Sequence, residues 1–434
     1  MRQRRTPPPG LPVIGIGIIL AALMLRPAAT SVGPVLAEIR GGVGMGATGA
    51  ALLAALPGLS FALAGSVAAR LGHRIGPACG LALAAVIGAV GLLGRSISTS
   101  AAPFLALSVV GLCGAGLGNV LVPMAIKQRF GLHAHRWTGI YVILLPIGAL
   151  LPQVLAPGII TAGGSWRQSL ALWGWGAMVS AVPWIAVVVN ARWRPGKGPE
   201  HGSVASVAVL ARGEDRGEAE SPARSAPGPG LADMARNPRA RSMGLFFGIQ
   251  SMHAYVTFAY LPQIFRDAGL SLASAALLLA GFSLCGTLAG LMVPTIVARA
   301  RDVGPWMLGL IALLVPGYLG LLLAPTALAW LWVVLLGLAG CTFQVVLVLV
   351  TARTRDYRVT AALSGFTQSL GYAMASAGPF LIGWLYGVAG GWRLPLIVLL
   401  ASVIPMAWFG WRICKPGYLD DELTTYQAAS LQTV

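Results

Sequence analysis

The side chain whose position most clearly indicates a chemical role is an arginine inside an apolar run. Arg26 lies in the segment LMLRPAATSVGP, within residues 13–37, a stretch long enough to cross a bilayer. A charge at that depth costs about 2.5–3.5 kcal/mol on insertion scales. Pro27 and Pro34 weaken the helix around it, because proline cannot donate a backbone hydrogen bond. We therefore ask which group the guanidinium binds.

Acidic side chains do not answer that question. The sequence has 13 Asp and Glu residues, and all of them lie near the ends of apolar runs, in a polar central segment or in the C-terminal tail. Arg26 thus has no protein counter-ion at its own depth. We expect it to pair with an anionic group of a substrate, and the alternative is a bond to carbonyls that the prolines leave free.

Other polar side chains lie inside apolar runs and are candidates to contact a substrate. They would be costly against lipid, so they should face a wet cavity or a neighbouring helix. For each amide the alternative is an ordinary hydrogen bond between helices. Tyr255 adds a further aromatic wall. Besides Arg26, the substrate-binding candidates are Thr30, Asn119, Tyr141, Gln153, Gln250, His253, Tyr260, Gln344, Gln368 and Tyr372.

Two side chains are candidates for proton coupling. His253 is the histidine inside a predicted span, and histidine changes charge near neutral pH. Glu38, at the end of the first run, is the second candidate. For His253 a plain helix contact is an equal alternative.

The composition places these residues in a membrane protein. The 434 residues are 56% hydrophobic and only 10% charged, whereas soluble domains carry about 25% charged residues. Twelve runs are long enough to span a bilayer as helices. We predict an all-α protein with helices over 13–37, 46–69, 75–94, 101–126, 137–162, 170–190, 241–265, 272–298, 305–324, 328–352, 360–388 and 392–412.

The basic residues predict the orientation. With the N-terminus in the cytoplasm, 24 of the 30 Lys and Arg residues fall on the cytoplasmic side and five, Arg95 among them, fall in outer loops. This follows the positive-inside rule, so both termini should be cytoplasmic. The net charge of +17 then reflects topology and not nucleic-acid binding. The alternative, that the first run is a signal peptide, would leave eleven spans.

Two halves are expected, because segments recur at a nearly constant offset. GLCGAGLGNVLVPMAIKQR (111–129) matches GLAGCTFQVVLVLVTARTR (337–355), and GGSWR (163–167) matches AGGWR (389–393). Parallel repeats with the substrate between them are a transporter design. The predicted organisation is a six-helix bundle over 1–190, a cytoplasmic linker over 191–240, a second six-helix bundle over 241–412 and a cytoplasmic tail over 413–434.

Motifs of other functions are weak or missing. GMGATG (44–49) fits a dinucleotide-binding pattern in letters only, since no strand precedes it. The sequence contains no P-loop, the five cysteines lack metal-site spacing, and no nucleophile stands beside a base at one depth. We therefore expect no enzyme activity, no cofactor and no metal site.

The segment GSVAARLGHR (65–74) resembles the signature of the major facilitator superfamily, G-x-x-x-D-R-x-G-R-R. Gly65, Arg70, Gly72 and Arg74 match it, while Ala69 stands where the family has aspartate. The resemblance implies a loop that helps to latch two halves together in one transport state. The missing aspartate implies a weaker charge-based latch.

LRPAATSVGPVL, GLGNVLVPMAIKQRF and AYLPQIF resemble segments of the cyanate-permease and 2-nitroimidazole-exporter branch of that superfamily. The resemblance implies a twelve-helix secondary transporter of a small solute that is anionic or carries a nitro group. Together with Arg26, it leads us to expect a monomeric transporter of the bacterial cell membrane that works by alternating access on a small anion such as cyanate, with Arg26 as the charge partner. The alternative is a proton-linked exporter of neutral nitroaromatic compounds. A membrane sensor without transport is the alternative outside this class.

Overall fold

The regular elements are all helices in the part of the chain that the computed structural model describes, residues 11–130, 133–192, 230–300 and 302–423. The first half contains α1 (Leu11–Leu25), α2 (Pro27–Thr30), the 3-10 turn η1 (Gly33–Val35), α3 (Leu36–Gly42), α4 (Ala47–Ile75), α5 (Pro77–Ile97), α6 (Ala101–Phe130), α7 (Ala134–Thr161) and α8 (Trp166–Arg192). The second half contains α10 (Leu231–Arg236), α11 (Pro238–Asp267), α12 (Leu272–Arg299), α13 (Gly304–Ala312), α14 (Leu314–Leu323), α15 (Ala329–Ala339), α16 (Thr342–Ala352), α17 (Tyr357–Ala389) and α18 (Arg393–Cys414).

Ten segments of the described chain are long and apolar enough to cross a membrane. The predicted all-α membrane fold is thus confirmed, but the count of twelve spans is not. The helices α11 and α17 have 30 and 33 residues and are long enough, yet they fall short in hydropathy. These two helices carry five of the candidates, Gln250, His253, Tyr260, Gln368 and Tyr372. Their low hydropathy is therefore a consequence of the side chains that they present inside the protein.

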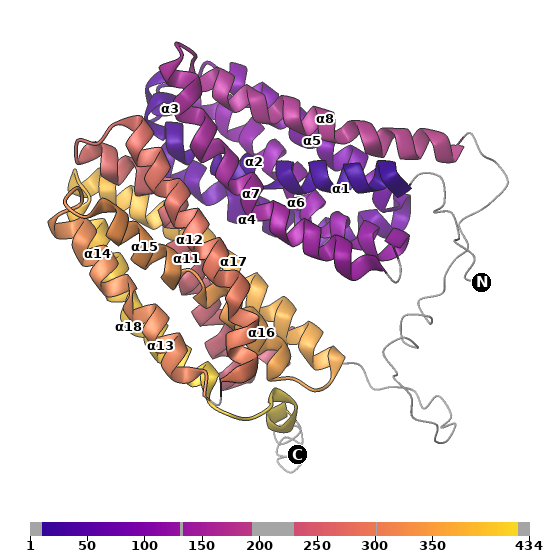
Figure 1. Cartoon of the computed structure of the whole chain (residues 1–434), viewed down its shortest axis with the longest axis vertical. Coiled ribbons are helices and arrows are strands. Elements are labelled where there is room, and N and C mark those ends of the chain that lie inside the picture. The colour runs from indigo at the N-terminus through magenta and orange to yellow at the C-terminus, as the bar shows by residue number, and fades with distance from the viewer. Residues whose placement is uncertain (1–10, 131–132, 193–229, 301, 424–434) are drawn as a thin grey trace, which may run out of the picture.

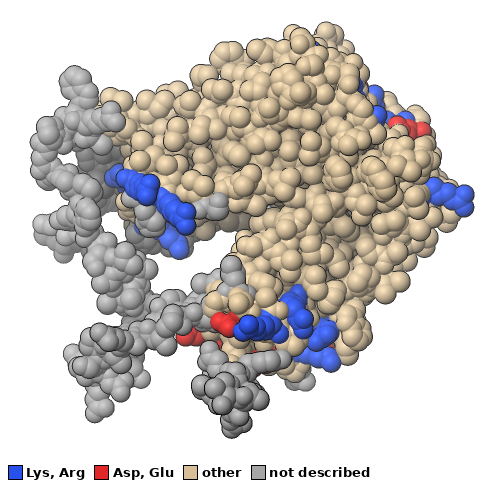
Figure 2. Space-filling view, turned by 180° about the vertical axis from the view of Figure 1, so that it is seen from behind, with Lys and Arg blue, Asp and Glu red and all other residues tan. Residues whose placement is uncertain are grey.

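The helices form two groups that meet along one side (Figure 1). We call the end where α1 and α11 begin and where α8 and α18 finish the terminal end. The opposite end, with the turns at 43–46, 98–100 and 268–271, is the distal end. The two groups lean together at the distal end and diverge towards the terminal end (Figure 1). Basic residues gather on both flanks of the indentation between the halves (Figure 2).

The contact between the halves is closest near the distal end. Glu38 of α3 forms an ion pair with Arg266 of α11 at 2.8 Å. Gly33 of η1 lies so close to α11 that a Cβ atom there would collide with the carbonyl oxygen of Phe258. Gly383 of α17 likewise packs against Ala51 of α4. Small residues at these points allow the backbones to approach closely.

Turn geometry repeats between the halves. Gly44 and Gly269 lie 225 positions apart, and both have positive φ, at 62° and 96°. Each residue stands in the turn after the first long segment of its half. Only glycine adopts this conformation at low cost, so the two turns have the same backbone requirement. This agrees with the offset found in the sequence.

The end of α4 differs from the prediction. The helix was expected to stop at residue 69, but α4 continues to Ile75 and the chain turns at Gly76, whose φ is 82°. The matched residues of the expected loop therefore lie on the last turns of a helix, because no proline stands between residue 69 and the Gly76–Pro77 pair. Arg70 and Arg74 are exposed there. Gly72 packs against Leu121 of α6, and Gly65 has no side chain near it.

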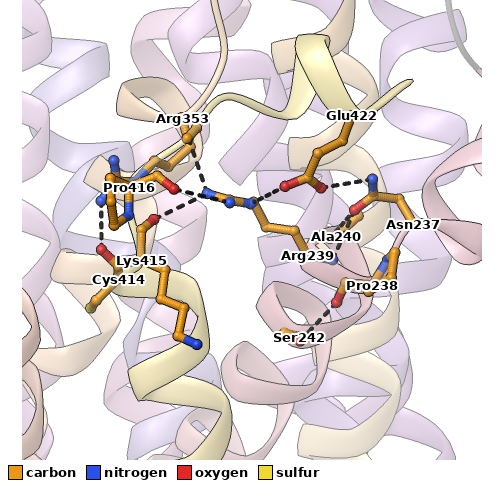
Figure 3. Close-up of polar contacts among 11 residues, drawn as sticks. Asn237, Pro238, Arg239, Ala240, Ser242, Arg353, Cys414, Lys415, Pro416 and Glu422 are labelled. Carbon is orange, nitrogen blue, oxygen red and sulfur yellow. Dashed lines mark hydrogen bonds and ion pairs between the residues drawn. The ribbon is translucent and has the colours of Figure 1, made fainter. Parts of the chain in front are cut away.

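The ends of the predicted linker and tail are more ordered than expected. Helices α10 and the start of α11 lie within 191–240, while residues 193–229 are outside the described chain. Beyond α18 the chain folds back over the terminal end of the second half (Figure 3). Arg239 of α11 binds Glu422 at 2.8 Å and donates to the carbonyls of Lys415 and Gly417. This folded-back segment, residues 415–423, is called the C-terminal strap below.

Candidate functional site

The first membrane segment is broken at Arg26. The helix α1 ends at Leu25, and Pro27 occupies the first turn of the short helix α2 with Arg26 as its N-cap. The backbone amide and the hydroxyl of Thr30 both bind the Arg26 carbonyl, at 3.1 and 3.2 Å. A second irregular turn, η1, contains Pro34. The two prolines thus produce the interruption that the sequence predicted, and this interruption, residues 26–35, is called the helix-1 break.

A buried arginine from another helix holds the helix-1 break. Arg95 of α5 is fully buried, and it donates to the Ala28 carbonyl at 3.1 Å and to the Ser31 hydroxyl at 2.8 Å. The prediction that Arg95 lies in an outer loop is wrong, because α5 extends to Ile97. The signal was present in the sequence, since apolar Ile97 follows Arg95 and Ser96. The carbonyl in the break is therefore bound by Arg95 and not by Arg26.

The surroundings of Arg26 include tyrosine side chains from both halves. Arg26 lies within electrostatic range of Tyr141 of α7, Tyr255 of α11 and Tyr372 of α17. Its own side chain is half-buried, and no hydrogen bond or ion pair engages the guanidinium among the described residues. A free guanidinium fork beside phenolic hydroxyls provides several donors at one place. That arrangement suits a small anion.

Asn119 and Tyr372 differ in how their side chains are held. Gly118 of α6 packs against Leu25, the residue before the helix-1 break, so Asn119 lies next to it. The Asn119 amide is half-buried and has no hydrogen bond within the described chain. The Tyr372 ring is oriented by an edge contact with Phe247, with ring centroids 5.6 Å apart.

Gln153 connects the two halves. Its side chain is fully buried on α7, and its Oε1 atom accepts a hydrogen bond from Ser283 of α12 at 3.0 Å. The Nε2 atom has no partner in the described chain. Gln153 thus makes the interhelical bond that was the alternative to substrate contact, and one donor remains free.

His253 lies in a separate polar centre inside the second half. Its Nδ1 atom is 2.7 Å from the Tyr318 hydroxyl of α14, and its Nε2 atom is 3.1 Å from the Ser402 hydroxyl of α18. Ser402 donates its own proton to the Leu399 carbonyl, so Nε2 carries hydrogen and Nδ1 accepts from Tyr318. The cavity beside His253 has a volume of about 20 Å³, which is room for one water and not for a substrate.

The remaining candidates have partners or close neighbours within the second half. Gln250 accepts weakly from Ser251, and Gln368 donates to Ser364 one turn earlier. Tyr260 donates to the Pro379 carbonyl at 3.0 Å, near the distal contact between the halves. Gln344 lies against Gly290, where α12 and α16 meet. The structure therefore places Tyr141 and Tyr372 of the predicted set within electrostatic range of Arg26, with Tyr255, which the sequence marked only as an aromatic wall. Asn119 follows Gly118, the residue of α6 that packs on Leu25.

Comparisons with known proteins agree with this architecture. The profile of the Major Facilitator Superfamily matches residues 18–376. The chain is 30% identical over 406 residues to the uncharacterised transporter YycB of Bacillus subtilis (strain 168), covering 93% of this chain and 94% of that one. Two proteins of Escherichia coli (strain K12) also match. The 2-nitroimidazole transporter is 29% identical and covers 92% and 94% of the two chains, and the cyanate transport protein CynX is 27% identical and covers 87% and 91%.

A solved structure has the same fold. The bacterial homologue of the human lysosomal transporter Spinster, in its inward-facing and unoccupied conformation, superposes with a TM-score of 0.72. It is 15% identical in sequence, and the superposition covers 94% of this chain and 98% of that one. At this identity the likeness concerns the fold alone.

Proposed function

The chain belongs to the Major Facilitator Superfamily of membrane transporters, and we propose that it carries a small anion such as cyanate, with Arg26 as the charge partner. The observation that carries the proposal is the guanidinium of Arg26 at the helix-1 break, which has no partner in the described chain and lies within electrostatic range of tyrosines of both halves. The likeness to the cyanate transport protein supports the same class of solute.

The charge balance around Arg26 supports an anion over a neutral solute. An arginine inside a membrane protein is stable when a carboxylate or a set of carbonyls satisfies it. The carbonyl of Ala28 in the helix-1 break is bound by Arg95, and the described carboxylates lie near the two ends of the molecule. An anionic solute completes the pairing, and the tyrosine hydroxyls add donors to its other atoms.

We propose that transport proceeds by alternating access between the two halves. The distal end is closed by the Glu38–Arg266 pair and close backbone contacts, while the halves diverge at the terminal end. The basic residues at the terminal end support a cytoplasmic location for it, under the positive-inside rule. We propose a monomer, because one chain supplies all the side chains around Arg26.

A second candidate is the proton-linked export of a neutral nitroaromatic compound. The 29% identity to the 2-nitroimidazole transporter favours it, and the tyrosines around Arg26 could stack on a small ring. Under this candidate Glu38 is better placed than His253 to couple protons. Glu38 bridges the halves, whereas both ring nitrogens of His253 bind within the second half.

Flux in proteoliposomes tests the two candidates. Purified protein is reconstituted, and uptake of labelled cyanate and of 2-nitroimidazole is measured with and without a pH gradient, beside liposomes that lack protein. Saturable cyanate flux with weak 2-nitroimidazole flux is the expected result. Saturable 2-nitroimidazole flux driven by the pH gradient, without cyanate flux, would replace the first proposal by the second. The absence of flux for cyanate and for 2-nitroimidazole would contradict both proposed functions.

A further inference from the structure

We propose that Arg95 is a positioning residue for transport, which holds the helix-1 break in the shape that presents Arg26 to the solute. The inference rests on the proposed function, since it gives Arg95 a role through Arg26. Arg95 itself is fully buried and does not reach the solute space.

The hydrogen bonds of Arg95 fall on the part of the break that follows Arg26. One goes to the carbonyl of Ala28 inside α2, and the other goes to the hydroxyl of Ser31 just beyond it. These two acceptors lie three positions apart, so one planar guanidinium spans the short helix α2. The carbonyl of Arg26 is bound from the same helix by Thr30. Arg95 and Thr30 together therefore determine where α2 lies and where Arg26 points.

A purely structural role is a poor account of a charge at this place. Arg95 makes no ion pair with any residue that the structure describes, and its Nε atom is buried without a partner. Burying an unpaired charge is costly, and a neutral side chain would pack there at less cost. An arginine whose hydrogen bonds go to one carbonyl and one hydroxyl of an irregular segment is explained if that irregular shape is needed for binding.

The test is a comparison of Arg95→Lys with the wild type for one anionic and one neutral probe. Lysine keeps the charge but cannot bond to both acceptors in the same plane. We expect the KM for cyanate to rise about tenfold, while 2-nitroimidazole flux changes by less than about twofold. In an Arg26→Gln background, Arg95→Lys should change cyanate flux no further. If Arg95 had only a structural role, Arg95→Lys would lower the flux of both probes to the same extent, with Arg26 present or replaced.

Ser31→Ala is the second variant, for the case in which Arg95→Lys does not fold. It removes one of the two bonds and keeps the arginine, and it should raise the cyanate KM about threefold. The matched control is Ser180→Ala, because Ser180 is also buried but bonds only to Ala177 of its own helix. An unchanged cyanate KM in both Arg95→Lys and Ser31→Ala would overturn the inference.

A measurement without any solute separates this inference from the proposed function. Backbone amides of residues 28–33 and 35 should exchange with deuterium faster in Arg95→Lys and Ser31→Ala than in the wild type and Ser180→Ala. If the wild type carries neither probe, the proposed function fails, and this exchange still decides the role of Arg95. Equal exchange in all four proteins would contradict that role.

Discussion

The two halves of the molecule each bury a polar centre, and the two centres treat their charge-bearing side chain in opposite ways. In the first half, the guanidinium of Arg26 donates to no acceptor among the described residues and lies within electrostatic range of Tyr255 of the other half. In the second half, both ring nitrogens of His253 have partners on α14 and α18. The two residues looked alike in the sequence, as polar side chains inside apolar runs.

The difference indicates which centre can bind a solute. A polar group inside the protein that has all its hydrogen-bond partners adds to stability. One without partners carries an uncompensated desolvation cost, which a bound ligand can offset. Arg26, at the helix-1 break, is a group without a hydrogen-bond partner in the described chain. Two hydrogen-bond partners place His253 in the first group, and the cavity beside it, of about 20 Å³, leaves no room for a solute.

The largest effect is expected for Arg26→Gln. Removing a charge-assisted hydrogen bond of about 1.5–3 kcal/mol should lower kcat/KM for cyanate by about 10- to 100-fold. The measurement is initial cyanate flux in proteoliposomes against concentration. Arg393→Gln is the control, because Arg393 is an exposed arginine of the distal end. Wild-type kinetics in Arg26→Gln would contradict the conclusion that the centre at Arg26 binds the solute and the centre at His253 does not.

His253→Ala should lower the stability of the protein and leave its transport kinetics nearly unchanged. It removes the partner of the buried Tyr318 hydroxyl, at about 1–3 kcal/mol, while the half-buried Ser402 hydroxyl keeps its bond to the Leu399 carbonyl. We expect a lower Tm in detergent and a KM for cyanate within about twofold of the wild type. The pH dependence of flux is measured in parallel. If it becomes flat in His253→Ala, His253 relays protons and the second centre is functional after all.

Most of the fold could be predicted from the sequence, because hydrophobic length and the distribution of basic residues are local signals. Every predicted span has a helical counterpart, and the repeat offset reappears in the glycine turns. The ends of helices were less accurate. The helix α4 continues through its two arginines to Gly76, and α5 includes Arg95, since exposed or paired polar residues do not stop a helix.

The candidate site was only partly predictable, because partners come from helices that are distant in the chain. Arg26 was found from its type and depth. The role of Arg95 depends on a contact across 67 positions, and that of His253 depends on contacts with Tyr318 and Ser402, across 65 and 149 positions. No spacing rule within one helix contains this information. Sequence could therefore nominate the polar residues but could not say which of them are satisfied.

A smaller effect is expected at the distal contact between the halves. Glu38→Gln and Arg266→Gln each remove a partly exposed ion pair, and such pairs contribute about 0.2–1 kcal/mol. Distal opening should therefore become up to about fivefold more populated. Distances between spin labels at Thr99→Cys and Ala327→Cys, on the distal turns of the two halves, report this opening.

The charge swap Glu38→Arg with Arg266→Glu is the control for that pair. It should restore the wild-type distance distribution, because the attraction is regained with its sign reversed. If the swap opens the distal end as much as either single variant, the pair does not hold the two halves together.

The smallest effect is expected at the C-terminal strap, where a carboxylate has all its partners and lies far from Arg26. Burial alone would raise the pKa of Asp420, but hydrogen bonds from the amides of Asp356 and Arg355, both at 2.9 Å, bring it below its usual value. A lowered pKa in the folded state stabilises the protein above the usual carboxyl range, and this contribution disappears as the pH falls through the lowered value. Asp420→Asn should therefore reduce the unfolding free energy by less than about 1 kcal/mol at neutral pH and by nothing at about pH 2. The Tm difference from the wild type at the two pH values measures this, with cyanate KM unchanged at neutral pH. A shifted KM would mean that the strap affects the solute site, and partnered carboxylates could then no longer be treated as purely structural.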